Sequence, residues 1–124
     1  MECALLMWCK SLLRHVLNYV SVLEAKNGPC PLGIYNLCFV PAAMVSCKGE
    51  GTRKAESYIV EDRIEGTWQK YILNSRAVPL MAADEQGYER AQFMCFLQHL
   101  QFDKTKGLAY ISDWQGTLFL ILSE

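Results

Sequence analysis

Hydrophobic residues recur at helical spacing in two stretches of the chain. Residues 2–25 predict an amphipathic helix, because apolar side chains return every three or four positions (Leu5, Cys9, Leu12, Leu13, Val16, Leu17, Val20). Asn27, Gly28 and Pro29 predict its end, since a proline cannot continue the helix. Residues 84–101 predict a second helix, whose apolar positions are spread widely enough to be covered on most of its circumference.

Between the two helices the pattern changes to short apolar runs that are typical of strands. Residues 38–47 form one such run, which Pro41 interrupts, so we expect a bent or an edge strand. Residues 48–54 form a charged turn with two glycines, and residues 57–61 predict the returning strand of a hairpin. Residues 67–73 predict two helical turns, and residues 75–83 a linker.

The end of the chain holds the first candidate site. An apolar run over residues 108–112 predicts a strand that leads into Asp113, Gln115 and Gly116, and a second apolar run covers residues 118–122. In an extended segment, side chains two positions apart lie on one face. A carboxylate and an amide on one face could orient a hydroxyl or share a hard cation. The alternative is that these residues only turn the chain.

Lys70 and Asn74 form a second candidate pair. They lie four positions apart, so the predicted helical turns would place them on one face. A cation beside an amide suits the oxygens of a phosphate or of another anion. The alternative is a solvated helix face with no ligand.

Composition and charge narrow the class of protein. The 124 residues allow one domain with a modest core, and 52% of them are hydrophobic. Twelve basic residues against thirteen acidic ones give no basic surface for nucleic acid, which we therefore do not expect as a partner. No apolar stretch is long enough for a membrane span, so no membrane partner is expected either.

The cysteines predict an intracellular, cytoplasmic protein. No pair has the Cys-x-x-Cys spacing of zinc ligands or redox centres, and most of the thiols lie inside apolar runs. We expect reduced thiols that act as small core hydrophobes. They are Cys3, Cys9, Cys30, Cys38, Cys47 and Cys95.

Four motifs in a fixed order carry a family resemblance. They are residues 58–71 (YIVEDRIEGTWQKY), 96–102 (FLQHLQF), 105–107 (TKG) and 113–116 (DWQG). Together they resemble the alpha-kinases, atypical protein kinases that include the myosin heavy-chain kinases, elongation-factor-2 kinase and the channel-kinases, and that are numerous in fungi. The resemblance runs from Leu5 to the C-terminus.

The resemblance implies an α+β fold, a partial two-lobed kinase-like domain. A helix packed on antiparallel strands would form the remainder of the N-lobe in residues 1–60. The hinge and the segment after it would occupy residues 61–74, and the C-lobe of helix and strands would begin at residue 75 and continue to residue 124.

The resemblance also implies a role for individual residues. Glu61 matches the hinge acid near the adenine of ATP, and Lys70 and Asn74 match residues near the phosphates. Asp113 matches the catalytic aspartate that accepts or orients the substrate hydroxyl, and Gln115 matches a glutamine associated with Mg²⁺.

Two further residues match only in part. His99 corresponds to one of four zinc ligands of the full family domain, but we expect no zinc in this chain because the other ligands are missing from its sequence. Glu124 stands near the expected place of a second metal-binding aspartate, shifted by one position and longer by one methylene. The family's lysine-bearing strand would precede the first helix, where this sequence begins, so we expect a domain truncated at both ends.

The expected function is phosphorylation of protein serine or threonine, with ATP and Mg²⁺ as cofactors and a protein substrate as partner. Such a reaction needs a carboxylate for the hydroxyl, oxygen donors for the metal and a cation for the phosphates. The alternative is a non-catalytic remnant that binds protein or nucleotide without transferring phosphate.

Overall fold

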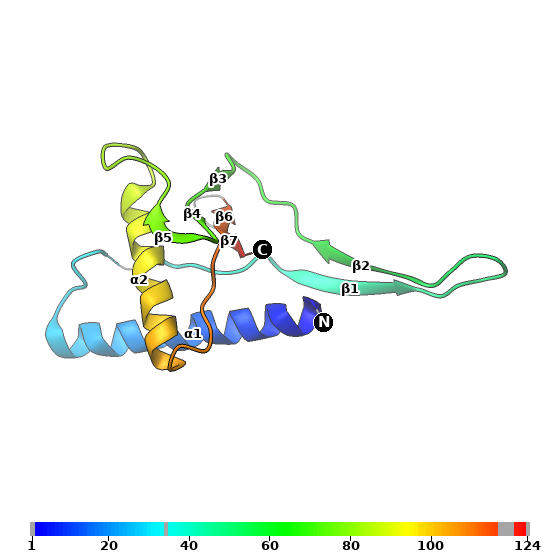
Figure 1. The fold of residues 1–124 in the computed structure, drawn as a ribbon, viewed down its shortest axis with the longest axis horizontal. Coiled ribbons are helices and arrows are strands. Elements are labelled where there is room, and N and C mark those ends of the chain that lie inside the picture. The colour runs from blue at the N-terminus through cyan, green and yellow to red at the C-terminus, as the bar shows by residue number, and fades with distance from the viewer. Residues whose placement is uncertain (1, 34, 117–120, 124) are drawn as a thin grey trace.

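A computed structural model describes residues 2–33, 35–116 and 121–123. The described ranges contain two helices and several short antiparallel strands, which confirms the α+β fold class. In Figure 1, α2 runs across α1, the short strands lie beside α2, and a long two-stranded ribbon extends from the body. The elements are α1 (Glu2–Asn27), β1 (Ala42–Cys47), β2 (Glu56–Glu61), β3 (Gln69–Lys70), β4 (Ile72–Leu73), β5 (Arg76–Pro79), α2 (Tyr88–Lys104), β6 (Trp114–Gly116) and β7 (Ile121–Ser123).

Helix α1 confirms the first predicted helix and ends where the sequence indicated. Gly28 has a φ of 89°, and its N–H donates to the carbonyl oxygen of Glu24 over 2.9 Å. A residue without a side chain adopts this left-handed conformation at little cost. One stripe of the helix is buried and packs mainly against α2, through Leu13, Val16 and Val20.

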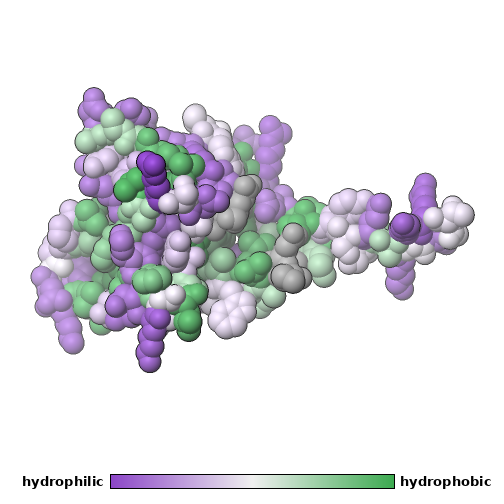
Figure 2. Space-filling model, in the orientation of Figure 1, coloured by the Kyte–Doolittle hydropathy of each residue, from purple (hydrophilic) through white to green (hydrophobic). Residues whose placement is uncertain are grey.

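The predicted hairpin is confirmed as the β1–β2 ribbon. Its strands pair antiparallel from Ala42 opposite Glu61 to Cys47 opposite Glu56, and β1 begins directly after Pro41. Nearly every residue of the two strands is exposed, including the cross-strand neighbours Val45 and Tyr58. In Figure 2 the ribbon projects away from the rest of the molecule and is mostly hydrophilic at its tip.

The prediction of helical turns over residues 67–73 is wrong. The segment forms β3 and β4 instead, and β4 turns back at residues 74–75 to pair with β5, which lies in the predicted linker. The N–H of Tyr71, between β3 and β4, donates to the carbonyl oxygen of Trp114 over 2.8 Å. Aromatic and β-branched residues favour strand pairing. The partner of β3 lies far along the chain, so a local pattern could not reveal it, whereas β4 forms a local hairpin with β5 that the sequence analysis did not predict.

Helix α2 confirms the second predicted helix, but both of its ends lie later in the sequence than predicted. Gly87, with a φ of 94°, precedes its first turn, so Asp84 and Glu85 lie outside the helix and Glu89 is the acidic residue of that turn. Side chains on most of its circumference are buried, as predicted: Ala91, Phe93, Met94, Cys95, Leu97, Gln98 and Gln101. No described helix has the length and apolar character to cross a bilayer.

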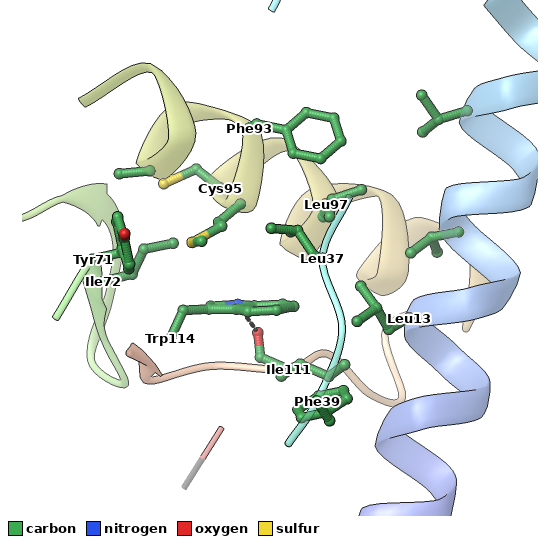
Figure 3. Packing of buried hydrophobic residues seen from close by; sticks show 14 of the residues in the cluster. Leu13, Leu37, Phe39, Tyr71, Ile72, Phe93, Cys95, Leu97, Ile111 and Trp114 are labelled. Atoms are coloured by element: carbon green, nitrogen blue, oxygen red, sulfur yellow. Dashed lines mark hydrogen bonds between the residues drawn. The ribbon is translucent and has the colours of Figure 1, made fainter. Parts of the chain in front are cut away.

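The core lies between the two helices, strand β4 and the segments around residues 37–40 and 111–114 (Figure 3). Trp114 is fully buried at its centre and stacks on Phe39 with 6.2 Å between the ring centroids. The indole N–H of Trp114 donates to the carbonyl oxygen of Ile111 over 3.0 Å. A buried indole with its N–H satisfied fixes the chain immediately after Asp113.

The cysteines divide between core and surface. Cys95 is buried, and burial raises the pKa of its thiol, as partial burial raises the pKa of Cys9. Cys38 and Cys47 are exposed, so the expectation that most cysteines fill the core is wrong for these two. Cys47 ends β1, and an isolated ribbon has no core into which its side chains could pack.

Leu97 and Leu108 provide a matched test of this core. Leu97 is fully buried in α2, whereas Leu108 is 87% exposed. We expect Leu97→Ala to lower the free energy of unfolding by about 2–5 kcal/mol because it leaves a cavity. Leu108→Ala should change it by less than about 0.5 kcal/mol. Urea denaturation followed by tryptophan fluorescence measures both, and equal effects of the two substitutions would contradict the described packing.

Candidate functional site

A short sheet brings together two segments that lie far apart in the sequence. Strand β3 pairs antiparallel with β6, which places Lys70 opposite Gln115 and Gln69 opposite Gly116. Residues directly opposite each other in an antiparallel pair lie on the same face of the sheet. The pairing therefore holds the lysine beside the segment that carries Asp113 and Gln115.

Lys70 and Asp113 form an ion pair. Nζ of Lys70 lies 2.5 Å from Oδ1 of Asp113, and the side chains are 38% and 9% exposed respectively. A carboxylate withdrawn from water needs a partner of opposite charge, which the lysine supplies. An ammonium group carries three N–H donors, so a lysine that gives one to a carboxylate can still bind an anionic ligand on its solvent side.

Asp113 does not end a strand as the sequence predicted. Strand β6 begins one residue later, and residues 108–112 form no strand. Asp113 has a φ of 57°, a left-handed conformation in which an aspartate is more common than most other residues. The prediction that Asp113 and Gln115 share a face through regular extended backbone is therefore wrong, although both side chains are buried near Lys70 and its strand.

Tyr71 supports the lysine that precedes it. Its side chain is 1% exposed, and its hydroxyl accepts a hydrogen bond from Nη1 of Arg90 over 3.2 Å. The same guanidinium lies over the ring of Tyr35, with 5.2 Å to the centroid. Backbone bonds tie Tyr71 to Trp114 on one side and to Leu80 on the other. Because these contacts hold Tyr71 in place, they also hold the backbone of the adjacent Lys70 in place.

Among the described residues, neither Glu61 nor Asn74 forms an ion pair or a side-chain hydrogen bond with this group. Glu61 is exposed at the end of β2, opposite Ala42 in the ribbon. Asn74 is exposed in the turn between β4 and β5, because residues 69–73 form strands rather than the helix that would have put it beside Lys70. Glu124 lies outside the described residues.

Asn74 lines a hollow of about 250 Å³ that includes Gln98 of α2 but neither Lys70 nor Asp113. His99, which is exposed, and Arg76 lie at the same hollow, together with the ring of Tyr110. Within the described ranges, no three His, Cys, Asp or Glu side chains gather closely enough to hold a metal ion. The hollow therefore offers a cation and polar groups, but not a cluster of metal ligands.

Two glutamines of α2 belong to the site but were not singled out from the sequence. Gln98 and Gln101 both hydrogen-bond to the backbone of Ile111, two residues before Asp113. Both residues are buried, at 3% and 0% exposure. The available signal was a polar residue, Gln98, among the apolar positions of a helix predicted to be buried, because a polar side chain there needs a partner.

Together these observations define a small α+β domain with a half-exposed lysine on a buried aspartate and an amide beside them, an arrangement suited to binding an anionic ligand. The sequence matches the model of the alpha-kinase family over residues 2–123. The chain therefore belongs to the alpha-kinase family, as its motifs indicated. Searches of curated proteins and of solved structures find no match.

The ion pair itself can be tested without any assay of activity. Lys70→Met leaves the buried carboxylate of Asp113 without its partner, and we expect it to lower the free energy of unfolding by about 1–3 kcal/mol, between the values typical of exposed and of buried pairs. In an Asp113→Asn background the same substitution should cost much less. Lys54→Met, in the exposed hairpin, is the matched control.

Additive effects in this double-mutant cycle would contradict the contact. Urea denaturation of the four proteins provides the free energies, and a coupling close to zero would mean that the two side chains do not interact in solution.

Proposed function

We propose that this chain binds ATP with Mg²⁺ and transfers the γ-phosphoryl group to a serine or threonine hydroxyl of a protein substrate. Membership of the alpha-kinase family supports kinase chemistry in general. The observation that carries the proposal is the Lys70–Asp113 ion pair, with Gln115 on the strand directly opposite the lysine.

Asp113 and Lys70 have distinct parts in the proposed reaction. Asp113 accepts a hydrogen bond from the substrate hydroxyl and orients its oxygen toward the phosphoryl group. Lys70 binds phosphate oxygens through the N–H donors that Asp113 does not use. Because phosphoryl transfer depends mostly on positioning and on charge stabilisation, the fixed geometry of β3 and β6 is an advantage for catalysis.

The side chains of the site fit a magnesium ion in their chemistry. Gln115 presents an amide oxygen on the face of the sheet that carries Lys70, and hard cations prefer oxygen ligands. Mg²⁺ in nucleotide sites is held largely by the phosphates and by water, so it needs few protein ligands. When bound, the ion neutralises charge that develops on the phosphates.

The roles of the remaining expected residues are predictions. Glu61 is proposed to lie near the adenine, with the hinge and the segment after it in residues 61–74, and Asn74 to approach the phosphates. Glu124 is proposed as a further metal ligand. Asn74 would have to reach the nucleotide from the turn after β4, because it lines a hollow that does not include Lys70 or Asp113.

A phosphate-transfer assay tests the proposal. The full chain is incubated with radiolabelled ATP, Mg²⁺ and casein as a general serine- and threonine-containing acceptor. We expect Asp113→Asn to lower the rate by about 100-fold or more, because a neutral amide cannot take the proton of the hydroxyl as a carboxylate can, while the shape of the site is kept. Asp84→Asn, at an exposed acid before α2, should leave the rate unchanged.

Nucleotide binding separates the enzyme from a binding module. Calorimetry with Mg·ATP should show weaker binding for Lys70→Ala than for Asp113→Ala, since only the lysine supplies a positive charge to the phosphates. A chain that binds Mg·ATP in this way but transfers phosphate no faster than Asp113→Asn would contradict the enzymatic proposal and would favour a nucleotide-binding module.

A further inference from the structure

Two buried glutamine side chains of α2 hold the backbone just before Asp113. Nε2 of Gln98 donates to the carbonyl oxygen of Ile111, and Oε1 of Gln101 accepts from the N–H of Ile111, each over 2.7 Å. The glutamines lie three positions apart, so they project from one face of the helix. They bind both polar backbone groups of a single residue, and we call the pair the amide clamp.

The amide clamp satisfies polar backbone groups that are withdrawn from water, because Ile111 is only 3% exposed. An apolar side chain at position 101 would leave the buried N–H of Ile111 without a partner, which costs free energy. The two glutamines therefore stabilise the fold and fix the position of Ile111 at the same time.

The clamp acts close to the group that the proposed reaction needs most accurately placed. Ile111 is two residues from Asp113, and its carbonyl oxygen also accepts the indole N–H of Trp114. Asp113 thus lies between two fixed points of backbone, and it has the left-handed conformation that the surrounding contacts must maintain. From there its carboxylate reaches Lys70.

We infer that Gln98 and Gln101 are positioning residues, which set the carboxylate of Asp113 against Lys70 by fixing both backbone groups of Ile111. Their effect on catalysis rests on the proposed function. Their effect on the geometry of the ion pair does not, so the two can be measured separately.

The first measurement is kinetic. Gln98→Met keeps the size of the side chain but loses the donor, while the carbonyl of Ile111 still has the indole of Trp114 as a partner. We expect kcat to fall roughly 10- to 100-fold, the order of effect that a small misplacement of a catalytic group produces, with KM for ATP unchanged. Gln101→Met should act in the same direction.

The matched control is Gln92→Met on the same helix. Gln92 is half-buried and donates to the hydroxyl of Tyr88, so it makes a side-chain hydrogen bond without contacting Ile111. Its kcat and KM should equal those of the wild type. A fall in kcat for Gln98→Met that matches a fall in the folded fraction, measured by circular dichroism, would overturn the inference.

The second measurement does not depend on activity. In protein labelled with ¹³C at aspartate, the resonance of the Asp113 carboxyl carbon should move when Lys70→Met removes the ammonium. We expect this response to shrink in the Gln98→Met and Gln101→Met backgrounds and to persist in Gln92→Met. An undiminished response in both clamp variants would overturn the inference.

The two measurements distinguish the inference from the proposed function. A wild-type chain that transfers no phosphate, but whose Asp113 resonance responds as expected, would contradict the kinase proposal and support the clamp. A chain with normal kcat in Gln98→Met and Gln101→Met would leave the kinase proposal intact and contradict the clamp.

Discussion

Backbone pairing between β3 and β6 is the constraint on which the rest of the site depends. Each strand is very short, yet the pairing sets Lys70 opposite Gln115 and continues into the bond from Tyr71 to Trp114. Two or three residues of ladder would be unstable alone. They persist because Tyr71 and Trp114, which adjoin one end of the pairing, are fully buried in the core, and because β6 also pairs with β7. The site is therefore an extension of the core rather than a feature of a surface loop.

Helix α2 packs against the segments that carry the site residues but not against the whole molecule. Helix α2 contributes its buried side chains, its two clamp glutamines and Arg90 to the neighbourhood of Lys70 and Asp113. The β1–β2 ribbon, which carries Glu61, lies exposed beyond that support. Catalysis and phosphate binding require accurately placed side chains, and the residues that α2 supports are the ones held most firmly. Lys70 and Asp113, the residues of the proposed phosphate site, therefore lie against the core, whereas Glu61, which is proposed to lie near the adenine, is exposed.

The sequence predicted the long elements well and the short ones poorly. Both helices and the hairpin follow from local periodicity and from turn residues such as Gly28, and these are confirmed. Residues 67–73 have a helical spacing, but β3 pairs with Trp114–Gly116, a partner that no local pattern identifies, and β4 pairs with the adjacent β5. The extended backbone of β3 and β4 and the turn after β4 separate Asn74 from Lys70. The motifs identified Lys70, Asp113 and Gln115 as candidate site residues. The sequence could mark Gln98 as a polar residue in a buried helix, but the contact of Gln98 and Gln101 with Ile111 follows only from the structure.

The most direct test of the proposed location is paramagnetic line broadening by Mn²⁺, a substitute for Mg²⁺, bound with ATP to ¹⁵N-labelled protein. If the nucleotide phosphates and their metal bind at the ion pair, the backbone amide signals of Lys70, Asp113 and Gln115 broaden first, and those of Asn74 and His99, at the separate hollow, broaden less. Broadening centred on His99 and Asn74, or none at saturating Mn·ATP, would contradict the proposed site.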